Sequence, residues 1–233
     1  MRPVSWGGRA IDEISAKLLE IRELYGGADA VAFLASSKVS NEENYLLQKI
    51  ARLFGTNNID NCARLCHEAS VHALKMTVGG AGGAQTNPYA DLEGGFGAIL
   101  IWGGYNPAET HPVVMDYILR ARKNGGARII VVDVRKTRTM AFADYGLIVR
   151  PGTDITLANA MMNVIIREEL HDEDFVRGGR TTGFSEVRMA VRKYTPEYAE
   201  KITGVPAGGV IREVARTFAL AGSGGAVMWG GWD

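Results

Sequence analysis

The sequence contains only two cysteines, Cys62 and Cys66, among its 233 residues. Two thiols are too few for a disulfide framework, so a reducing compartment is expected and we predict a cytoplasmic protein. The pair is spaced C-x-x-x-C, and no C-x-x-C occurs. A zinc ribbon or an iron–sulfur cluster needs more thiolates than this, so we expect neither to be held by this chain alone.

Charge of one sign and long apolar runs are also lacking. Lysine and arginine together number 26, and so do aspartate and glutamate, which gives a formal net charge of 0. No overall field therefore favours nucleic acid or an anionic membrane. The longest apolar runs, such as 98–102, are far too short to span a bilayer, and no apolar signal segment stands at the start. We predict no nucleic-acid partner and no membrane span.

Two glycine motifs that bind nucleotides are not matched. No G-x-G-x-x-G follows the first expected strand, which argues against an ordinary nicotinamide dehydrogenase. The segment 79–83 reads Gly-Gly-Ala-Gly-Gly, but no apolar strand precedes it and no Gly-Lys-Ser/Thr follows it. A phosphate loop is therefore only weakly indicated there. Glycine itself is frequent, at 29 residues, and most Gly-Gly pairs fit short connections between elements.

Strand-like and helix-like segments alternate along the chain. The expected strands are 29–35, 97–102, 127–132, 146–149 and 225–229, and the main expected helices are 11–25, 41–54, 111–123, 154–170 and 206–221. The alternation predicts an α/β fold of doubly wound, mostly parallel sheets with helices on both faces, an αβα arrangement of the dinucleotide-binding kind. The sequence stops at a glycine turn, 230–233, directly after the last strand. We therefore expect an incomplete piece of a longer polypeptide or one part of a split subunit.

Polar residues gather after four of the expected strands. In doubly wound sheets the carboxyl ends of the strands form the ligand-binding edge. Glycine amides and a helix N-terminus suit phosphate there, while carboxylates suit ribose hydroxyls or a guanine edge. The four segments are 36–38, 103–109, 133–136 and 151–154. Together they predict a nucleotide-like ligand that lies across the sheet edge.

The same residues also have purely structural explanations. Asp154 could cap the helix that begins there. Asp133 could pair with Arg135 or Arg138, and His111 could be a structural histidine beside its proline. Two further histidines occur in helix-like segments without a visible partner, and we interpret them as structural or surface residues: His72 and His171.

A cysteine stands directly before a histidine at Cys66 and His67, with Arg64 two places before the cysteine. A turn precedes this stretch and an apolar helical run follows it. We therefore expect a strand or loop to pass into a helix N-terminus here, where a thiolate is stabilised. Cysteine–histidine nucleophiles usually pair residues that are distant in sequence, so the adjacency does not indicate a protease. The structural alternative is a buried, inert thiol at Cys66.

Six segments, taken in order, carry a family resemblance. They are SWGGRAIDEISAKL, GTNNIDNCARLCH, WGGYNPAETHP, VVDVRKTRTMAFAD, VRPGTDITLANAM and TPEYAEKITGVPAGGVIREVARTFA. Over essentially its whole length the chain resembles formate dehydrogenase catalytic (alpha) subunits. These belong to the molybdopterin oxidoreductase superfamily, which carries a bis-molybdopterin guanine dinucleotide cofactor with molybdenum or tungsten. The resemblance implies reversible two-electron oxidation of formate to carbon dioxide.

The resemblance also implies roles for individual residues. Cys66 matches the cysteine or selenocysteine that ligates the metal, and a thiolate is a soft ligand that suits such a metal. His67 matches the histidine that formate dehydrogenases place at the substrate, where periplasmic-type nitrate reductases typically have methionine. Ser37, Lys38 and Cys62 match positions near the pterins. The residues that match guanine dinucleotide-binding loops are Trp102, Gly103, Gly104, Tyr105, Asn106, Glu109, Asp133, Arg135, Lys136, Thr137, Gly152, Thr153 and Asp154.

The sequence departs from the family pattern at both ends. Such subunits usually begin with a four-cysteine domain that holds a 4Fe-4S cluster, and they continue to a catalytic arginine and a C-terminal cofactor domain. We therefore expect residues 1–60 to be part of a first αβα molybdopterin-binding domain. Residues 61–233 are expected to form a second, Rossmann-like domain that binds the guanine dinucleotide, with its C-terminal completeness left open. Alone, the chain is expected to be inactive.

The implied partners follow from these departures. They are formate and carbon dioxide, an iron–sulfur electron-transfer subunit or domain that holds the 4Fe-4S cluster, and the remaining part of the catalytic subunit.

Three other functions stay open on the sequence. A formylmethanofuran dehydrogenase is another superfamily member that places histidine after the cysteine. A non-catalytic scaffold domain keeps the fold and loses the metal, although retention of Cys66, His67 and all three guanine-loop segments disfavours it. A nicotinamide-binding domain is disfavoured by the missing glycine motif.

Overall fold

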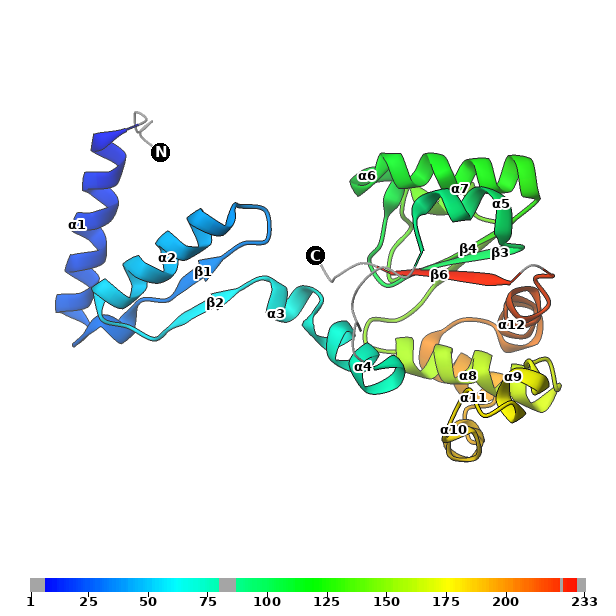
Figure 1. Ribbon diagram of the computed structural model, residues 1–233. Coiled ribbons are helices and arrows are strands. Elements are labelled where there is room, and N and C mark those ends of the chain that lie inside the picture. The colour runs from blue at the N-terminus through cyan, green and yellow to red at the C-terminus, as the bar shows by residue number, and fades with distance from the viewer. Residues whose placement is uncertain (1–6, 80–86, 223, 230–233) are drawn as a thin grey trace. The chain divides into compact units, whose positions relative to one another are not determined.

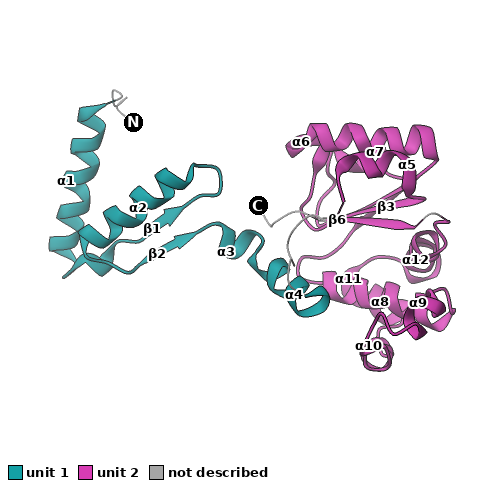
Figure 2. Cartoon of the chain, viewed as in Figure 1, with its two compact units in different colours: residues 1–83 teal, residues 84–233 magenta. Residues whose placement is uncertain are grey.

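The computed structural model describes residues 7–79, 87–222 and 224–229. Its contacts divide the chain into unit 1, residues 1–83, and unit 2, residues 84–233 (Figure 1, Figure 2). This division reflects packing, and the assignment of 1–60 and 61–233 to two cofactor-binding domains stays a prediction. Most of the glycine-rich segment 79–83 and the expected turn at 230–233 lie outside the described residues.

Unit 1 contains a two-stranded parallel sheet. Its elements are α1 (Gly8–Leu24), η1 (Ala28–Ala30), β1 (Phe33–Ala35), α2 (Asn41–Phe54), β2 (Ile59–Asn61), α3 (Ala63–Cys66) and α4 (Glu68–Val78). Strand β1 pairs with β2, with Phe33 opposite Ile59. The core of the unit is small. Among the residues that the structure describes there, three hydrophobic residues are buried in it: Val31, Phe33 and Ala51. Leu34, whose side chain points to the other face of the sheet, is 77% exposed.

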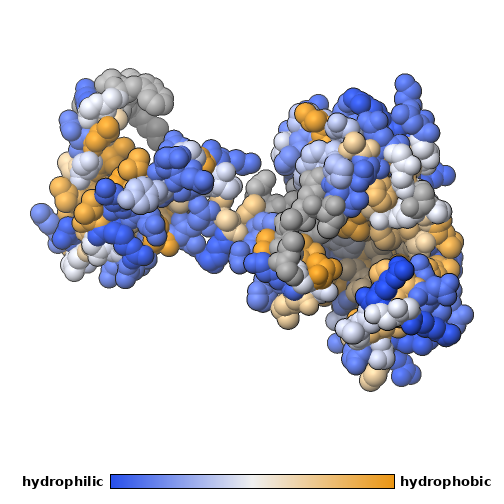
Figure 3. All heavy atoms as spheres, in the orientation of Figure 1, coloured by the Kyte–Doolittle hydropathy of each residue, from blue (hydrophilic) through white to orange (hydrophobic). Residues whose placement is uncertain are grey.

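Apolar residues gather on the surface of unit 1 (Figure 3). Helix α1 has no buried residue, and its Ile11, Ile14 and Leu24 are all more than half exposed. Scattered single apolar residues are normal on a protein surface, but a helix with several of them is not. Unit 1 therefore buries little of the apolar surface that its sequence provides.

Helix α2 confirms the expected helix 41–54. Ser40 is its N-cap, and its hydroxyl accepts a hydrogen bond from the backbone N–H of Glu43 at 3.2 Å. The carboxylate of Glu43 in turn accepts from the Ser40 N–H at 2.7 Å, which completes a capping box. At the other end Gly55 adopts φ 102°, a left-handed conformation that suits glycine.

Strand β1 is shorter than expected, since it begins at Phe33 and not at Asp29. Residues 28–30 form the 3₁₀ turn η1 instead. The side chain of Asp29 explains the difference, because it accepts a hydrogen bond from the Thr56 hydroxyl at 2.7 Å. Asn58 also donates to the backbone carbonyl of Asp29 at 2.8 Å. The carboxylate and the backbone carbonyl of Asp29 therefore bond to Thr56 and Asn58, and Asp29 does not join the hydrogen bonds between β1 and β2.

Unit 2 contains a four-stranded parallel sheet in the order β5-β4-β3-β6. Its first elements are η2 (Tyr89–Asp91), α5 (Leu92–Gly95), β3 (Ala98–Trp102), α6 (Pro107–Thr110), α7 (Pro112–Gly125), β4 (Arg128–Asp133), η3 (Thr139–Phe142) and β5 (Tyr145–Ile148). They are followed by α8 (Asp154–Arg167), α9 (Glu173–Arg177), α10 (Phe184–Val191), α11 (Pro196–Thr203), the π-helical turn η4 (Ala207–Ile211), α12 (Arg212–Ala219) and β6 (Gly225–Trp229).

Helices cover both faces of this sheet (Figure 1). Ile99, Ile101 and Ile129 pack on one face with residues of α5 and α7. Leu100 and Ile130, which alternate with them, pack on the other face with residues of α8, α11 and α12. Because both faces are buried, β3 and β4 are continuous apolar runs, as expected for parallel strands. The expected αβα arrangement is confirmed in unit 2.

Two expected helices differ in detail. The expected helix 154–170 ends at Arg167, because Glu169 turns into the left-handed region at φ 56°. The expected helix 206–221 is a π-helical turn followed by α12, and the N–H of Ile211 reaches the carbonyl of Pro206, five residues back, at 3.2 Å. No helix in the described part of the chain has both the length and the hydropathy that a membrane crossing requires.

Ile101 offers a direct test of the core of unit 2. It lies on β3, is 0% exposed, and packs with residues of α5 and α7 on one face of the sheet. We expect Ile101→Ala to lower the free energy of unfolding by about 2–5 kcal/mol, because it removes buried methylene groups and leaves a cavity. The matched control is Ile155→Ala, since Ile155 is 73% exposed and should change stability by less than about 0.5 kcal/mol. Urea unfolding of both variants makes the comparison, and equal losses would contradict the packing.

Candidate functional site

The loops after β3, β4 and β5 leave the same edge of the unit 2 sheet, because the three strands are parallel. The N–H of Gly103 donates to the carbonyl of Val132 at 3.2 Å, which carries the pairing of β3 and β4 to this edge. The candidate residues of segments 102–109, 133–137 and 152–154 all lie here. The structure therefore brings together three of the four polar segments that the sequence singled out.

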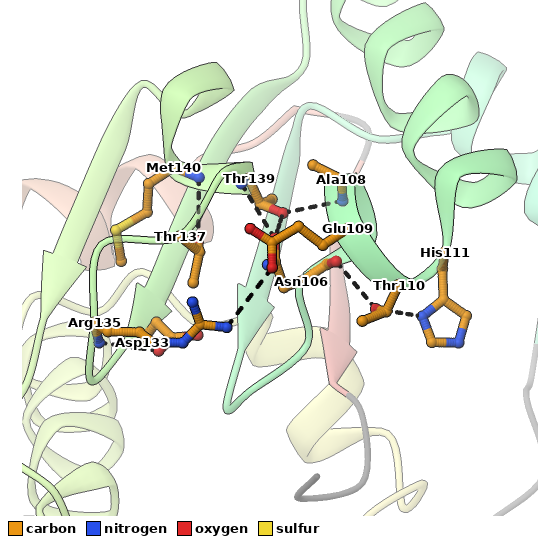
Figure 4. A network of polar contacts seen from close by, with 10 residues as sticks. All are labelled: Asn106, Ala108, Glu109, Thr110, His111, Asp133, Arg135, Thr137, Thr139 and Met140. Atoms are coloured by element: carbon orange, nitrogen blue, oxygen red, sulfur yellow. Dashed lines mark hydrogen bonds and ion pairs between the residues drawn. The ribbon is translucent and has the colours of Figure 1, made fainter. Parts of the chain in front are cut away.

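The loops after β3 and β4 are joined through Asn106 and Thr139 (Figure 4). Asn106 is 2% exposed and Thr139 is 0% exposed. The Asn106 Oδ1 atom accepts from the backbone N–H of Thr139 at 3.2 Å and also from the Thr139 hydroxyl. That hydroxyl accepts in turn from the N–H of Ala108 at 3.2 Å. The Nδ2 atom of Asn106 is buried and meets no acceptor among the described residues.

Asp133 is the last residue of β4 and is 5% exposed. Its Oδ1 atom accepts from the backbone N–H of Arg135 at 3.0 Å. The guanidinium of Arg135 points instead toward Glu109, at 3.8 Å (Figure 4). Within the described residues neither Arg135 nor Arg138 forms an ion pair with Asp133, so the structural alternative of a side-chain pair is wrong. A largely buried carboxylate is thus held at the edge by a backbone contact.

The structural explanation of Asp154 was that it caps α8. The structure contradicts this explanation. The N-cap is Thr153, whose hydroxyl donates to the carbonyl of Arg150 at 2.6 Å. The carboxylate of Asp154 accepts from the indole Nε1 of Trp102 at 2.8 Å. This hydrogen bond fixes the indole plane and ties the end of β3 to the start of α8.

The backbone at this edge leaves room for a ligand. Gly104 and Gly152 have φ values of 74° and 78°, and a Cβ atom built on either would meet nothing within 4 Å. Such glycines let another molecule approach the backbone amides closely. Burial, with a smaller contribution from Tyr89, raises the pKa of Tyr105 to about 12. The Tyr105 hydroxyl is therefore protonated near neutral pH and can donate.

The remaining candidates of these loops have simple surroundings. Thr137 is buried, and its hydroxyl accepts from the N–H of Met140 at 3.4 Å, whereas Lys136 is exposed. His111 contacts the Tyr105 ring at 5.0 Å between centroids, and its Nδ1 lies 2.8 Å from the Thr110 hydroxyl. These contacts favour the structural explanation of His111.

The carboxyl ends of β1 and β2 meet in unit 1. The Sγ atom of Cys62 accepts from the N–H of Ser37 at 3.1 Å and lies 3.3 Å from the Ser37 hydroxyl. The N–H of Cys62 donates to the carbonyl of Ala35 at 3.2 Å. Lys38 is exposed, and its backbone N–H donates to the Ser36 hydroxyl at 3.0 Å. The candidates Ser37, Lys38 and Cys62 are thus brought together at the edge of this small sheet.

Cys66 and His67 follow this edge directly. The chain passes from β2 into α3 at Cys62, as expected, and half-buried Cys66 ends that single turn. Its N–H donates to the carbonyl of Cys62 at 2.8 Å. His67 is both the C-cap of α3 and the N-cap of α4. Its Nδ1 atom is buried and has no hydrogen-bond partner in the described part of the chain.

The described residues contain no group of three or more His, Cys, Asp or Glu side chains that could enclose a metal ion. Thr139 was not identified from the sequence, although it lies within the quoted segment VVDVRKTRTMAFAD. Its only signal there was its place four residues after Arg135 in the loop that follows β4.

Two named relatives are similar to this chain. Formate dehydrogenase H of Escherichia coli (strain K12) is 44% identical over 232 residues, which are 99% of this chain and 31% of that protein. The F420-dependent formate dehydrogenase subunit alpha of Methanocaldococcus jannaschii is 46% identical over 178 residues, 76% of this chain and 26% of that protein. The chain thus spans less than a third of the length of these relatives.

A solved structure resembles the fold of this chain, and a family model matches its sequence. Acetylene hydratase from Pelobacter acetylenicus superposes with a TM-score of 0.64 at 29% identity, over 98% of this chain and 30% of that chain. The match to the family of molybdopterin oxidoreductases covers residues 1–229, and so includes both polar sheet edges and the Cys66–His67 pair. The chain accordingly belongs to the molybdopterin oxidoreductase family.

Proposed function

We propose that the chain is part of the catalytic subunit of a molybdopterin-dependent formate dehydrogenase. The reaction converts formate into carbon dioxide, two electrons and a proton, or runs in reverse. The observation that carries the proposal is the 44% identity to formate dehydrogenase H over 99% of the chain. Acetylene hydratase is less similar, at 29% identity, and its name describes a different reaction. The proposal therefore depends on the formate dehydrogenase relatives and on the residue pair Cys66–His67.

The edge of the unit 2 sheet fits a guanine dinucleotide. The buried Nδ2 of Asn106 lacks an acceptor among the described residues, which a nucleotide carbonyl or phosphate oxygen would supply. Asp133 offers a buried carboxylate oxygen, which suits the N–H groups of a guanine edge or a ribose hydroxyl. Gly104 and Gly152 leave open space beside the backbone, where phosphate could approach. The other assigned anchors are Trp102, Gly103, Tyr105, Glu109, Arg135, Lys136, Thr137, Thr153 and Asp154.

In unit 1, Cys66 would hold the metal through its thiolate, a soft ligand. When bound, the molybdopterin group supplies a molybdenum or tungsten ion that exchanges two electrons. His67 would orient formate by a hydrogen bond or accept the proton that is released when the C–H bond breaks. Its Nδ1 has no competing partner among the described residues. Ser37, Lys38 and Cys62 position the pterin.

Electron transfer requires a further part of the protein. The chain has two cysteines, and both are assigned to the pterin and metal region. The 4Fe-4S cluster would therefore be held by the remaining part of the catalytic subunit or by an iron–sulfur partner chain. We place the subunit in the cytoplasm, because free thiols such as those of Cys62 and Cys66 are kept reduced there.

The proposal is tested on the complete catalytic subunit with its iron–sulfur partner. We expect about one molybdenum or tungsten per subunit, guanine nucleotide released by acid hydrolysis, and formate-dependent reduction of a viologen dye. Formylmethanofuran serves as the control substrate in the same assay. Hydration of acetylene transfers no electrons to a dye, so that activity is followed separately by analysis of the product. A preparation that contains metal but reduces viologen only with formylmethanofuran would refute the formate assignment. One that contains neither metal nor guanine would indicate a scaffold.

A further inference from the structure

Thr139 controls which atom of the Asn106 side chain faces the sheet edge. The backbone N–H of Thr139 can only donate, so the Asn106 atom 3.2 Å away must be the carbonyl oxygen. The Thr139 hydroxyl also accepts from the N–H of Ala108 at 3.2 Å. Its own proton is thereby left to point at the same Oδ1 of Asn106. Two donors from one residue thus fix the orientation of this amide.

As a consequence, the NH₂ group of Asn106 has no hydrogen-bond partner among the described residues. Both lone pairs of Oδ1 are used by Thr139, and Nδ2 is buried without an acceptor among the described residues. A flip of the amide would put NH₂ against the backbone N–H of Thr139, which can only donate, so the flipped state is disfavoured. The edge between the loops after β3 and β4 therefore presents a fixed donor and requires an acceptor from its ligand.

We propose that Thr139 is a positioning residue that makes Asn106 a dedicated hydrogen-bond donor to the bound cofactor. The inference rests on the proposed function for the identity of that cofactor. The site then selects a ligand with a carbonyl, ring-nitrogen or phosphate acceptor at this point and rejects one that presents an N–H group. Neither Thr139 nor a fixed polarity of Asn106 follows from the loop sequence alone.

The contacts separate this role from plain stabilisation of the fold. Asn106→Asp keeps an oxygen that accepts both bonds from Thr139, but it replaces the NH₂ donor by an acceptor. Thr139→Val keeps the volume of the side chain and removes the hydroxyl, while Thr139→Ser restores the hydroxyl. A matched control is Thr110→Val, because the Thr110 hydroxyl donates at 3.0 Å to the backbone carbonyl of Asn106 and does not touch its amide.

The experiment uses the complete catalytic subunit and follows the release of guanine nucleotide during dialysis, with the melting temperature of cofactor-free protein measured in parallel. We expect Asn106→Asp to release nucleotide at least about tenfold faster than wild type, the effect of one lost hydrogen bond to a ligand. Thr139→Val should release it faster than Thr139→Ser, because the amide then loses the hydroxyl bond and is held by the backbone N–H alone. Thr139→Ser and Thr110→Val should stay within about twofold. The melting temperature of each cofactor-free variant shows whether faster release comes from the lost donor or from a loss of stability, which matters for Asn106→Asp because Asn106 is 2% exposed.

The outcomes are distinguishable. Wild-type release from Asn106→Asp would overturn the inference, since the donor would then be unused. Equally fast release from Thr110→Val and Thr139→Val would also overturn it, because the loop as a whole would then matter and not the amide orientation. A wild-type subunit that carries no guanine nucleotide would refute the proposed function itself, and the inference with it.

Discussion

Replacing Cys66 with serine is expected to abolish formate turnover and to remove most of the metal, while the fold is kept. A hydroxyl is a poor substitute for a soft thiolate ligand, so the substitution removes the protein ligand that we propose for the metal. The substitution changes one atom at a half-buried position that ends a single helical turn. We therefore expect little change in the melting temperature of cofactor-free protein. Metal content and formate-dependent viologen reduction are the measurements.

Cys62→Ser is the matched control for this experiment. Cys62 lies four residues earlier, and its sulfur accepts from the N–H of Ser37. A serine hydroxyl can accept the same bond, and Cys62 is proposed to contact the pterin and not the metal, so this variant should retain more metal than Cys66→Ser. Normal formate oxidation by Cys66→Ser would refute the assignment of the ligand. Equal losses in both variants would show that the loop, and not the thiolate of Cys66, is what the site requires.

His67→Gln is expected to keep the metal and to lower turnover by about 10²–10⁴-fold, the usual contribution of a positioned acid–base group. Glutamine can still hydrogen-bond formate, but it cannot take up a proton. Metal content should stay near the wild-type value, because the proposed metal ligand, Cys66, is unchanged. The informative quantity is turnover per bound metal ion, obtained from activity and metal content on the same sample.

His72→Gln provides the comparison, because His72 is an exposed histidine on the same helix, α4. It should behave as the wild type in both measurements. If His67→Gln loses metal in proportion to activity, His67 has a structural role and the assigned one is wrong. Full activity with full metal would contradict the assignment as well, and the pairing of cysteine with histidine would then have no chemical explanation.

The regular elements were predictable where local chemistry decides them. Ser40 and the two glutamates of the first turn are a local signal for the start of the expected helix 41–54, and the structure has those bounds. Strands β3 and β4 were recognised within one residue at each end, because strands buried on both faces must be continuous apolar runs. The αβα arrangement then follows from their alternation with helices.

The polar contacts of the site were not predictable in the same way. The bond from Trp102 to Asp154 joins residues 52 positions apart, and it decides that Asp154 orients an indole and does not cap its helix. Thr139 matters because its loop meets Asn106, 33 positions earlier in the sequence. Such pairs depend on which strands become neighbours in the sheet. A pattern within a single segment cannot supply that information.

The uneven burial of apolar residues has a consequence for where rigidity comes from. The proposed metal ligand, Cys66, belongs to unit 1, whose own core has three buried hydrophobic residues, whereas the larger cluster of unit 2 has fourteen. The free energy of local opening rises with the buried apolar contacts that must be broken. The proposed nucleotide anchors therefore belong to the part of the chain that is expected to open less readily by itself. The proposed metal ligand belongs to the part with fewer buried apolar contacts, so we expect metal affinity to rise when another surface packs against the exposed apolar side chains of unit 1.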